Sequence, residues 1–383
     1  MPSDGTHSRS LAWLAGAASA VALALSGVFP LENPDTFGHL AQGREIAELG
    51  HVPSHDTRSF FREPPAPFRN YEWLSDLGTF VAYRAGGADA LIAGKALLLA
   101  STALLLVALA GLHGGARAAL LCAVWLVAVI PAARFRFTVR PHLIALPLAA
   151  LYLLGLGYLA RAFGRGSRTG DALVIGGLGA LHALWVNLHG SHLLGLLITA
   201  LYLAAAWSAA GVRRRIAALL ALQLTASCLS PYGPAIALDA IAHVFDPRYR
   251  ALVAEWAPWS ADDPAAFAAA LIVQTAALAL VVRPLWRGGR AARGLLLASG
   301  VLALAAVRSV RFLDVYLLVA APAIAIGLRG ALARLHPRGL ALAAAALTTL
   351  FAAVAAWAAP RLPPYRGLGR GEDNALLPAA SAL

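Results

Sequence analysis

Residues 172–212 read ALVIGGLGALHALWVNLHGSHLLGLLITALYLAAAWSAAGV, a stretch without a single Asp, Glu, Lys or Arg. A helix that spans a bilayer needs about 20 apolar residues. The stretch is therefore long enough for two spans, and we expect the chain to reverse at its most polar point, Asn187-Leu188-His189-Gly190. Other uncharged runs of about one span each lie at 11–31, 141–160, 216–238, 264–282 and 339–360. The pattern predicts an all-α protein, a polytopic bundle of transmembrane helices.

The overall composition agrees with a membrane protein. Of the 383 residues, 60% are hydrophobic and only 13% are charged, which is not a soluble globular composition. The formal net charge is +12, but the arginines are scattered rather than gathered into a basic stripe, so nucleic acid is not an expected partner. The two cysteines, Cys122 and Cys228, lie in separate apolar runs and are expected to be small hydrophobic residues rather than a disulfide.

Hydropathy divides the chain into about eleven spans, at 11–31, 88–112, 117–133, 141–160, 172–188, 191–209, 216–232, 265–282, 294–307, 312–328 and 340–359. Lys and Arg accumulate in short cytoplasmic loops. Arginine occurs at 113–117, 161–170, 211–215, 283–293 and 329–338, which predicts the N-terminus inside and the C-terminus outside. The outer connections are then 32–89, 134–140, 187–189, 231–264 and 308–311. We expect residues 1–359 to form the transmembrane domain and 360–383 a short outer tail.

The first outer loop, 32–87, is long, and long loops between short connections are usually functional. Residues 35–49 are predicted to form an amphipathic helix that ends at Gly50, with Phe37, Leu40, Ala41 and Ala47 on one side. Asn70 is predicted to cap a second helix, 71–84, which Gly86-Gly87 stops. Two helices on the membrane surface would frame a cavity beside the bundle.

Asp35 follows the first span directly. A carboxylate at the membrane boundary, beside a low-dielectric interior, is placed to accept a proton from an acceptor hydroxyl. Asp is also among the best residues at a helix N-cap, so a catalytic base and a helix cap are both open from the residues alone. His39 lies one turn further and would share the same face of the helix.

Asp56 and Glu72 follow in the same loop. If a divalent cation is used, these two carboxylates and Asp35 would supply hard oxygen ligands. No metal motif of fixed spacing is present, so solvated surface acids are the alternative and the metal requirement stays unknown.

Two outer corners carry arginines against the orientation rule, at 134–142 and at 308–311. Charged residues that oppose such a rule at membrane depth are functional candidates. Because arginine can bind phosphate through two N–H groups, Arg140, Arg308 and Arg311 are predicted to hold the phosphate of a lipid-linked substrate. Contact with lipid headgroups, or ion pairs with Asp314 and Glu255, is the alternative.

Taken in chain order, these segments resemble the GT-C superfamily of polytopic glycosyltransferases, in particular bacterial relatives of the protein O-mannosyltransferases and lipid A aminoarabinose transferases. The matching segments are 35–43, 53–56, 71–74, 140–142, 187–190, 231–233, 255–256 and 308–311. The resemblance implies a transferase of the bacterial cytoplasmic (inner) membrane, with its active site outside and a polyprenyl-phosphate-linked sugar as donor. Relatives often continue into an outer C-terminal domain, so 360–383 would be the start of one.

The resemblance also assigns residues. It gives the role of catalytic base to Asp35. The candidates for substrate binding are His39, Asp56, Glu72, Arg140, His142, His189, Glu255, Arg308 and Arg311.

The sequence therefore predicts a membrane glycosyltransferase that acts among membrane lipids on an unidentified glycan, lipid or protein acceptor. Two alternatives stay open: a non-catalytic transporter or scaffold for polyprenyl-linked glycans, and a glycan ligase or polymerase that uses a diphosphate-linked donor. Transporters place charged or broken helices near mid-membrane. Here the polar residues collect at the outer rim, which favours the transferase.

Overall fold

The computed structural model describes residues 3–31, 33–55, 68–160, 168–247, 256, 259 and 265–332. All regular elements of these residues are helices, as predicted. They are α1 (Ser3–Ser26), α2 (Asp35–Leu49), α3 (Trp73–Ala133), η1 (Arg134–Arg136), η2 (Pro141–Ile144), α4 (Ala145–Leu159), α5 (Arg168–Leu188), α6 (His192–Ala205), α7 (Ala210–Ala226), α8 (Ala235–Phe245), α10 (Ala265–Arg287), α11 (Arg290–Arg308), η4 (Val310–Phe312), α12 (Leu313–Val319) and α13 (Ala321–Leu332).

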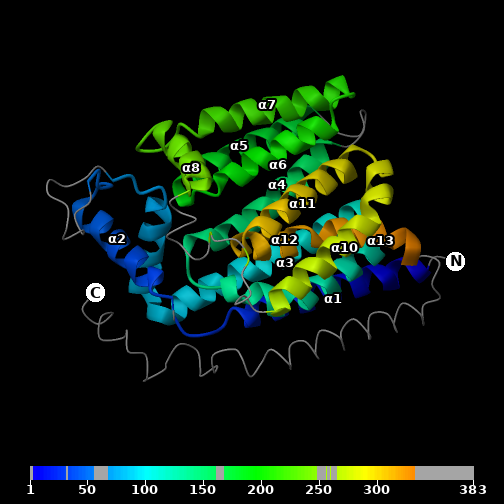
Figure 1. Cartoon of the computed structure of the whole chain (residues 1–383), viewed down its shortest axis with the longest axis horizontal. Helices are drawn as coiled ribbons and strands as arrows, with labels where there is room; N and C mark the ends of the chain where they lie inside the picture. Colours follow the sequence, from blue (N-terminus) through cyan, green and yellow to red (C-terminus); the bar gives the residue numbers. More distant parts are fainter. Residues whose placement is uncertain are drawn as a thin grey trace.

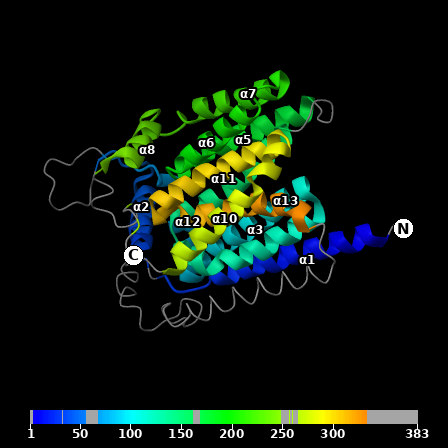
Figure 2. The same cartoon turned by 45° about the vertical axis from the view of Figure 1, so that its right-hand side comes forward.

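Most helices lie side by side in one bundle around an apolar core. Trp185, Tyr152, Tyr202 and Tyr316 are its largest fully buried side chains among the described residues. The short helices α2 and α8 lie at one end of the bundle, opposite the end at which α1 begins (Figures 1 and 2). This end therefore gathers segments that are far apart in the sequence.

The long element α3 is three helical segments, separated at Gly86-Gly87 and at Gly115, and the last two segments run antiparallel. Gly115 has a φ of 76°, a conformation that favours glycine. Beyond it the chain folds back, because Cys122 Sγ lies 3.6 Å from the carbonyl oxygen of Leu106. The predicted spans 88–112 and 117–133 are therefore the two arms of this hairpin. The predicted stop at Gly86-Gly87 is present too, as a break in helical geometry.

Every predicted span up to residue 328 overlaps a helix, and the predicted span 340–359 and the tail 360–383 lie outside the described residues. By length and composition alone, five helices of the described residues are able to cross a membrane. The number is six if η4–α12 and α13, bent by 43°, count as one span. That criterion counts the α3 hairpin once and leaves out two shorter apolar helices, Ser10–Ser26 of α1 and α6. The count of about eleven spans and the side that each loop faces stay predictions.

The helix α2 has the predicted bounds but buries a different side. Gly50 ends it with a φ of 70°, and its N–H donates to Ile46 O at 3.0 Å. The predicted inner side was wrong in part, because Ala47 is exposed. The residues that α2 buries are Thr36, Leu40, Gly43 and Ile46. Hydrophobicity could reveal Leu40 and Ile46 on this side but not Gly43, where a Cβ would lie 2.1 Å from the carbonyl oxygen of Asp76 in α3.

This contact predicts that Gly43→Ala separates α2 from α3 and lowers the free energy of unfolding by about 1–3 kcal/mol, as overpacking does. Gly38→Ala is the matched control on the same helix, because a Cβ there meets nothing within 4 Å. Alanine should stabilise the helix there by about 0.5–1 kcal/mol. Thermal unfolding in detergent compares the two variants, and equal melting temperatures would contradict the packing described.

Candidate functional site

Residues from several distant segments line one polar cavity of about 330 Å³ at the α2 end of the bundle. All five connections that the placement of arginines assigns to the outer side contribute residues to this cavity. The lining residues are Asp35, Gly38, His39, Gln42, Tyr71, Glu72, Arg140, Pro141, His142, His189, Trp256 and Arg311. The cavity therefore brings together most of the residues that sequence analysis singled out.

Asp35 and Arg140 form an ion pair at this cavity, with 2.9 Å between Asp35 Oδ2 and Arg140 Nη2. The Asp35 side chain is 51% exposed, so it lies in a wetter place than predicted. Its alternative role as a helix cap is wrong, since α2 begins at Asp35 itself and Pro34 is the N-cap residue. Instead, Asn33 Oδ1 accepts the Asp35 N–H at 2.9 Å. The carboxylate is thus directed at an arginine from a corner more than a hundred residues away.

A backbone contact holds the two partners in register. Thr36 donates its hydroxyl hydrogen to the carbonyl oxygen of Val139 at 2.8 Å. Thr36 and Val139 are the chain neighbours of Asp35 and Arg140. This hydrogen bond therefore keeps the backbone beside Asp35 close to the backbone beside Arg140, which favours the ion pair.

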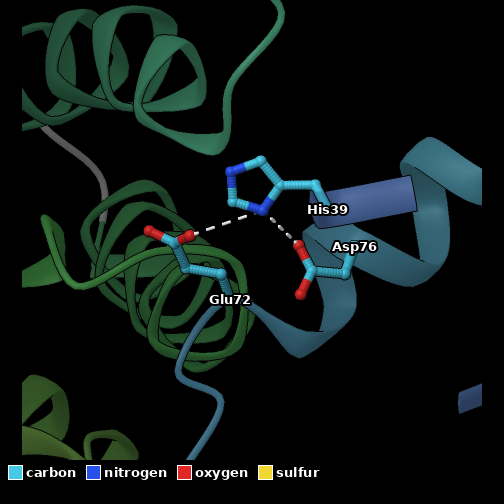
Figure 3. A group of neighbouring side chains, drawn as sticks. All are labelled: His39, Glu72 and Asp76. Carbon is cyan, nitrogen blue, oxygen red and sulfur yellow. Dashed lines mark hydrogen bonds and ion pairs between the residues drawn. The ribbon is translucent and has the colours of Figure 1, made fainter. Parts of the chain in front are cut away.

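A second cluster lies deeper and is drawn in Figure 3. His39 Nδ1 lies 2.7 Å from Asp76 Oδ1 and 3.7 Å from Glu72 Oε2, between the two carboxylates. Asn70 donates to the other carboxylate oxygen of Asp76 at 2.7 Å, and its Oδ1 accepts the Glu72 N–H at 2.9 Å. The predicted cap was wrong in detail, because α3 begins at Trp73 with Glu72 as its N-cap, and Asn70 bonds the N–H of that cap residue. Asn70 also satisfies a carboxylate that is fully buried.

His189 closes this cluster from the α5–α6 turn. Ser191 donates its N–H to His189 Nδ1 at 3.0 Å, so the ring hydrogen of neutral His189 is on Nε2. That nitrogen lies 3.1 Å from Glu72 Oε1. The turn is held against the first loop by Trp73, whose Nε1–H donates to Asn187 Oδ1 at 2.8 Å. The predicted reversal near Asn187 thus delivers a histidine to Glu72.

The surrounding charges set the ionisation of this cluster. Burial lowers the pKa of His39, but Asp76 and Glu72 outweigh burial, so the pKa lies above the ordinary 6.5. Burial raises the pKa of Glu72, but His189, His39 and Arg140 outweigh it, so this pKa lies below the ordinary value. The Glu72 carboxylate is therefore kept ionised in a site that excludes most water.

The donor set of this cluster fits a divalent cation. The ligand atoms of His39, Glu72 and Asp76 lie within 4.8 Å of one another, and one imidazole with two carboxylates suits a metal of the zinc or manganese type. The predicted set of Asp35, Asp56 and Glu72 is not what the described residues bring together. Asp35 is paired with Arg140, and Asp56 lies outside the described residues.

A larger and mainly apolar cavity of about 430 Å³ adjoins the polar one. The two share Tyr71, Glu72, His142, His189, Trp256 and Arg311. The apolar walls come from α6, α8 and α11 and include Leu193, Leu194, Leu197, Val244, Phe245, Val301, Leu302 and Ala305. At the junction, Arg311 lies over the ring of Trp256, 4.5 Å from its centroid. The polar cavity thus adjoins an apolar cavity, and Arg311 lines both of them.

The first loop is fastened to the segment before α8. Tyr232 accepts the Asn70 N–H at 3.0 Å and donates to Pro53 O at 3.2 Å. Arg69 forms an ion pair with Asp239, in which Nη2 lies 2.9 Å from Oδ1. The conspicuous Pro231-Tyr232-Gly233 sequence therefore serves to join the loop to the wall of the apolar cavity.

Some predicted site residues fall elsewhere. Arg308 is exposed and lines neither cavity, and Glu255 lies outside the described residues. Sequence analysis missed Asn70, Asp76 and Trp256 as site residues. The four-residue spacing of Glu72 and Asp76, which puts both on one face of a helix, was the available signal for Asp76.

The fold matches solved membrane glycosyltransferase structures. No family model and no curated protein matches the sequence. The oligosaccharyltransferase AglB from Archaeoglobus fulgidus, in complex with an inhibitory peptide and a dolichol-phosphate, matches with a TM-score of 0.66 and 14% identity over 88% of this chain and 52% of its own. ArnT from Cupriavidus metallidurans, bound to undecaprenyl phosphate, matches with a TM-score of 0.55 and 17% identity over 94% of this chain and 66% of its own.

At these identities the likeness shows the fold alone, and it agrees with the fold that the sequence resemblance implied. The chain spans about half the length of AglB and about two thirds of ArnT.

The Asn70 hydrogen bonds predict that Asn70→Ala lowers the free energy of unfolding by about 1–3 kcal/mol, because a buried carboxylate oxygen of Asp76 loses its donor. Ser54→Ala is the control, since it removes a hydrogen bond in an exposed position. Denaturant or thermal unfolding in detergent measures both variants. An unchanged stability of Asn70→Ala would show that Asp76 does not depend on this contact.

Proposed function

We propose that this chain is a membrane glycosyltransferase that transfers a sugar from a polyprenyl phosphate to an acceptor on the outer face of the bacterial cytoplasmic membrane. One observation carries the proposal: the Asp35–Arg140 ion pair lies at a polar cavity that adjoins a mainly apolar one, and Arg311 lines both. A proton acceptor, phosphate-binding groups and a place for a lipid chain are thereby adjacent.

The donor fits this division of the site. An isoprenoid chain is apolar and suits walls made of leucine, valine and phenylalanine. Its phosphate is an anion and suits Arg140 and Arg311, which face the polar cavity. AglB and ArnT, whose fold the chain shares, were each solved with a polyprenyl phosphate bound.

The chemistry is a displacement at the anomeric carbon. The acceptor hydroxyl oxygen forms a bond to this carbon, while the bond from the carbon to the phosphate oxygen breaks and its electron pair leaves with the phosphate. Asp35 accepts the hydroxyl proton, and Arg140 and Arg311 stabilise the charge that develops on the phosphate. An attack from the face opposite the phosphate inverts the sugar configuration.

The ion pair gives the two residues a switch between states. Without donor, Arg140 neutralises the Asp35 carboxylate at 2.9 Å. A donor phosphate competes for Arg140, and the carboxylate is then released to face the acceptor. A divalent cation held by His39, Glu72 and Asp76 would add electrostatic stabilisation of negative charge beside this place.

Asp35→Asn tests the base. The amide has nearly the same shape but cannot accept the proton, so we expect kcat to fall by about 10²–10⁴-fold. Glu48→Gln, an exposed acid on the same helix, should leave kcat unchanged. The assay measures transfer of radiolabelled sugar from undecaprenyl phosphate in membranes that express each variant. Full activity of Asp35→Asn would show that Asp35 is not the base. In a separate experiment, movement of labelled lipid across liposome membranes without a transfer product would favour a transporter.

Arg311→Gln tests the phosphate contact. Loss of a charged hydrogen-bond donor costs about 1.5–3 kcal/mol, so KM for the donor should rise about tenfold or more. Arg308→Gln is the matched control, because this arginine of the same corner is exposed and lines neither cavity. If the two variants have equal KM values, Arg311 does not bind the donor.

A further inference from the structure

Three polar side chains line the inner part of the larger cavity although all are buried. Asp314, at the start of α12, is 1% exposed, and Arg136 and His142 are 5% and 9% exposed. Both Asp314 and His142 lie within electrostatic reach of Arg136 and Arg311. Burial of a carboxyl group raises the free energy of the folded chain unless a hydrogen bond replaces the water that the group has lost.

The histidine, which lines this cavity, holds a buried hydrogen-bond acceptor beside it. His142 Nε2 lies 2.9 Å from the carbonyl oxygen of Arg136, which can only accept, so the ring hydrogen is on Nε2. Nδ1 of neutral His142 is then an acceptor, and it has no hydrogen-bond partner among the described residues.

The aspartate, which also lines this cavity, holds two further buried acceptors. Neither carboxyl oxygen of Asp314 has a hydrogen-bond partner within the described part of the chain. The N–H groups of Asp314 and Val315 lie near the carboxyl group but do not reach hydrogen-bond geometry. Whether ionised or protonated, the carboxyl group keeps acceptor capacity.

These acceptors need a ligand that donates hydrogen bonds. The phosphodiester of a polyprenyl-phosphate donor has oxygen acceptors only, and the isoprenoid chain has no polar hydrogen at all. Sugar hydroxyls are the donors that such a lipid carries. A carboxylate has two oxygens and can accept from two neighbouring hydroxyls, and His142 Nδ1 can accept from a third.

We propose that Asp314 and His142 form the subsite that recognises the sugar of the lipid-linked donor, and that they select sugars with adjacent free hydroxyls. This inference rests on the proposed function, because it assigns part of the same donor to a second set of residues. Arg311 and His142 line both cavities, so a sugar at the junction contacts this subsite while its anomeric carbon and phosphate stay at the polar cavity.

The test compares lipids with and without a sugar. Purified protein in nanodiscs is titrated with undecaprenyl phosphate and with undecaprenyl phosphate that carries glucose, galactose, mannose or N-acetylglucosamine. We expect at least one sugar-linked lipid to bind more tightly than the sugar-free lipid. In Asp314→Asn this gain should fall about tenfold, while affinity for the sugar-free lipid stays unchanged.

Deoxy sugars provide the same test without a variant. Removal of one of two adjacent hydroxyls from the preferred sugar should weaken binding to the unaltered chain about tenfold. If Asp314→Asn does not fold, this comparison and His142→Gln, whose amide can still donate to Arg136 O, keep the inference testable.

Two results would overturn the inference. One is that no sugar-linked lipid binds more tightly than undecaprenyl phosphate. The other is that Asp314→Asn weakens the binding of sugar-linked lipid and of sugar-free lipid by the same factor. Asp314 would then act by positioning Arg136 and Arg311. Both readouts are binding affinities. A chain that binds the sugar as described yet transfers none of it would disprove the proposed function and leave this subsite standing.

Discussion

The bilayer imposes the constraint on which this structure depends: backbone polar groups within it must bond inside helices, and charges must lie at helix ends or in protected cavities. The uncharged stretches have no other solution than a bundle of helices. Polar residues are thereby confined to the connections, and five of these connections meet at one end of the bundle. Residues as distant as Asp35, Arg140 and Arg311 become neighbours because the lipid-facing part of the chain leaves them no other place.

Short-range contacts then fix the positions of the polar residues at this end of the bundle. Gly43 allows α2 to lie directly on α3, and Thr36 bonds to the backbone beside Arg140. Asn70 joins the start of α3 to the buried Asp76, and Tyr232 joins the same loop to the segment before α8. Each contact is local and small, but together they hold the ion pair, the His39–Glu72–Asp76 cluster and the apolar wall around one space. The same polar end supplies the charged groups and also the acceptors of Asp314 and His142, which lack a hydrogen-bond partner within the described part of the chain.

Much of the helical fold was predictable from the sequence, because apolar runs long enough to cross a bilayer form helices. The helical segments and the reversal near Asn187 followed from hydropathy, and the end of α2 at Gly50 and the break at Gly86-Gly87 followed from the glycines. The place of Gly43 on the buried side of α2 did not, since a glycine has no hydrophobic side chain. The Asp35 ion pair and the roles of Asp76 and Asp314 depend on tertiary neighbours that spacing does not reveal. Arg308 and Arg311 lie in one corner and look alike in sequence, yet the helical turn between them puts only Arg311 at the cavities.

The most direct measurement of the central claim is a cryo-electron microscopy structure of the chain with undecaprenyl phosphate bound. The account predicts that the phosphate lies within hydrogen-bond distance of Arg140 and Arg311, that Asp35 no longer contacts Arg140, and that the isoprenoid chain follows the apolar walls of α6, α8 and α11. A lipid phosphate bound elsewhere, with Asp35 and Arg140 still paired, would contradict it.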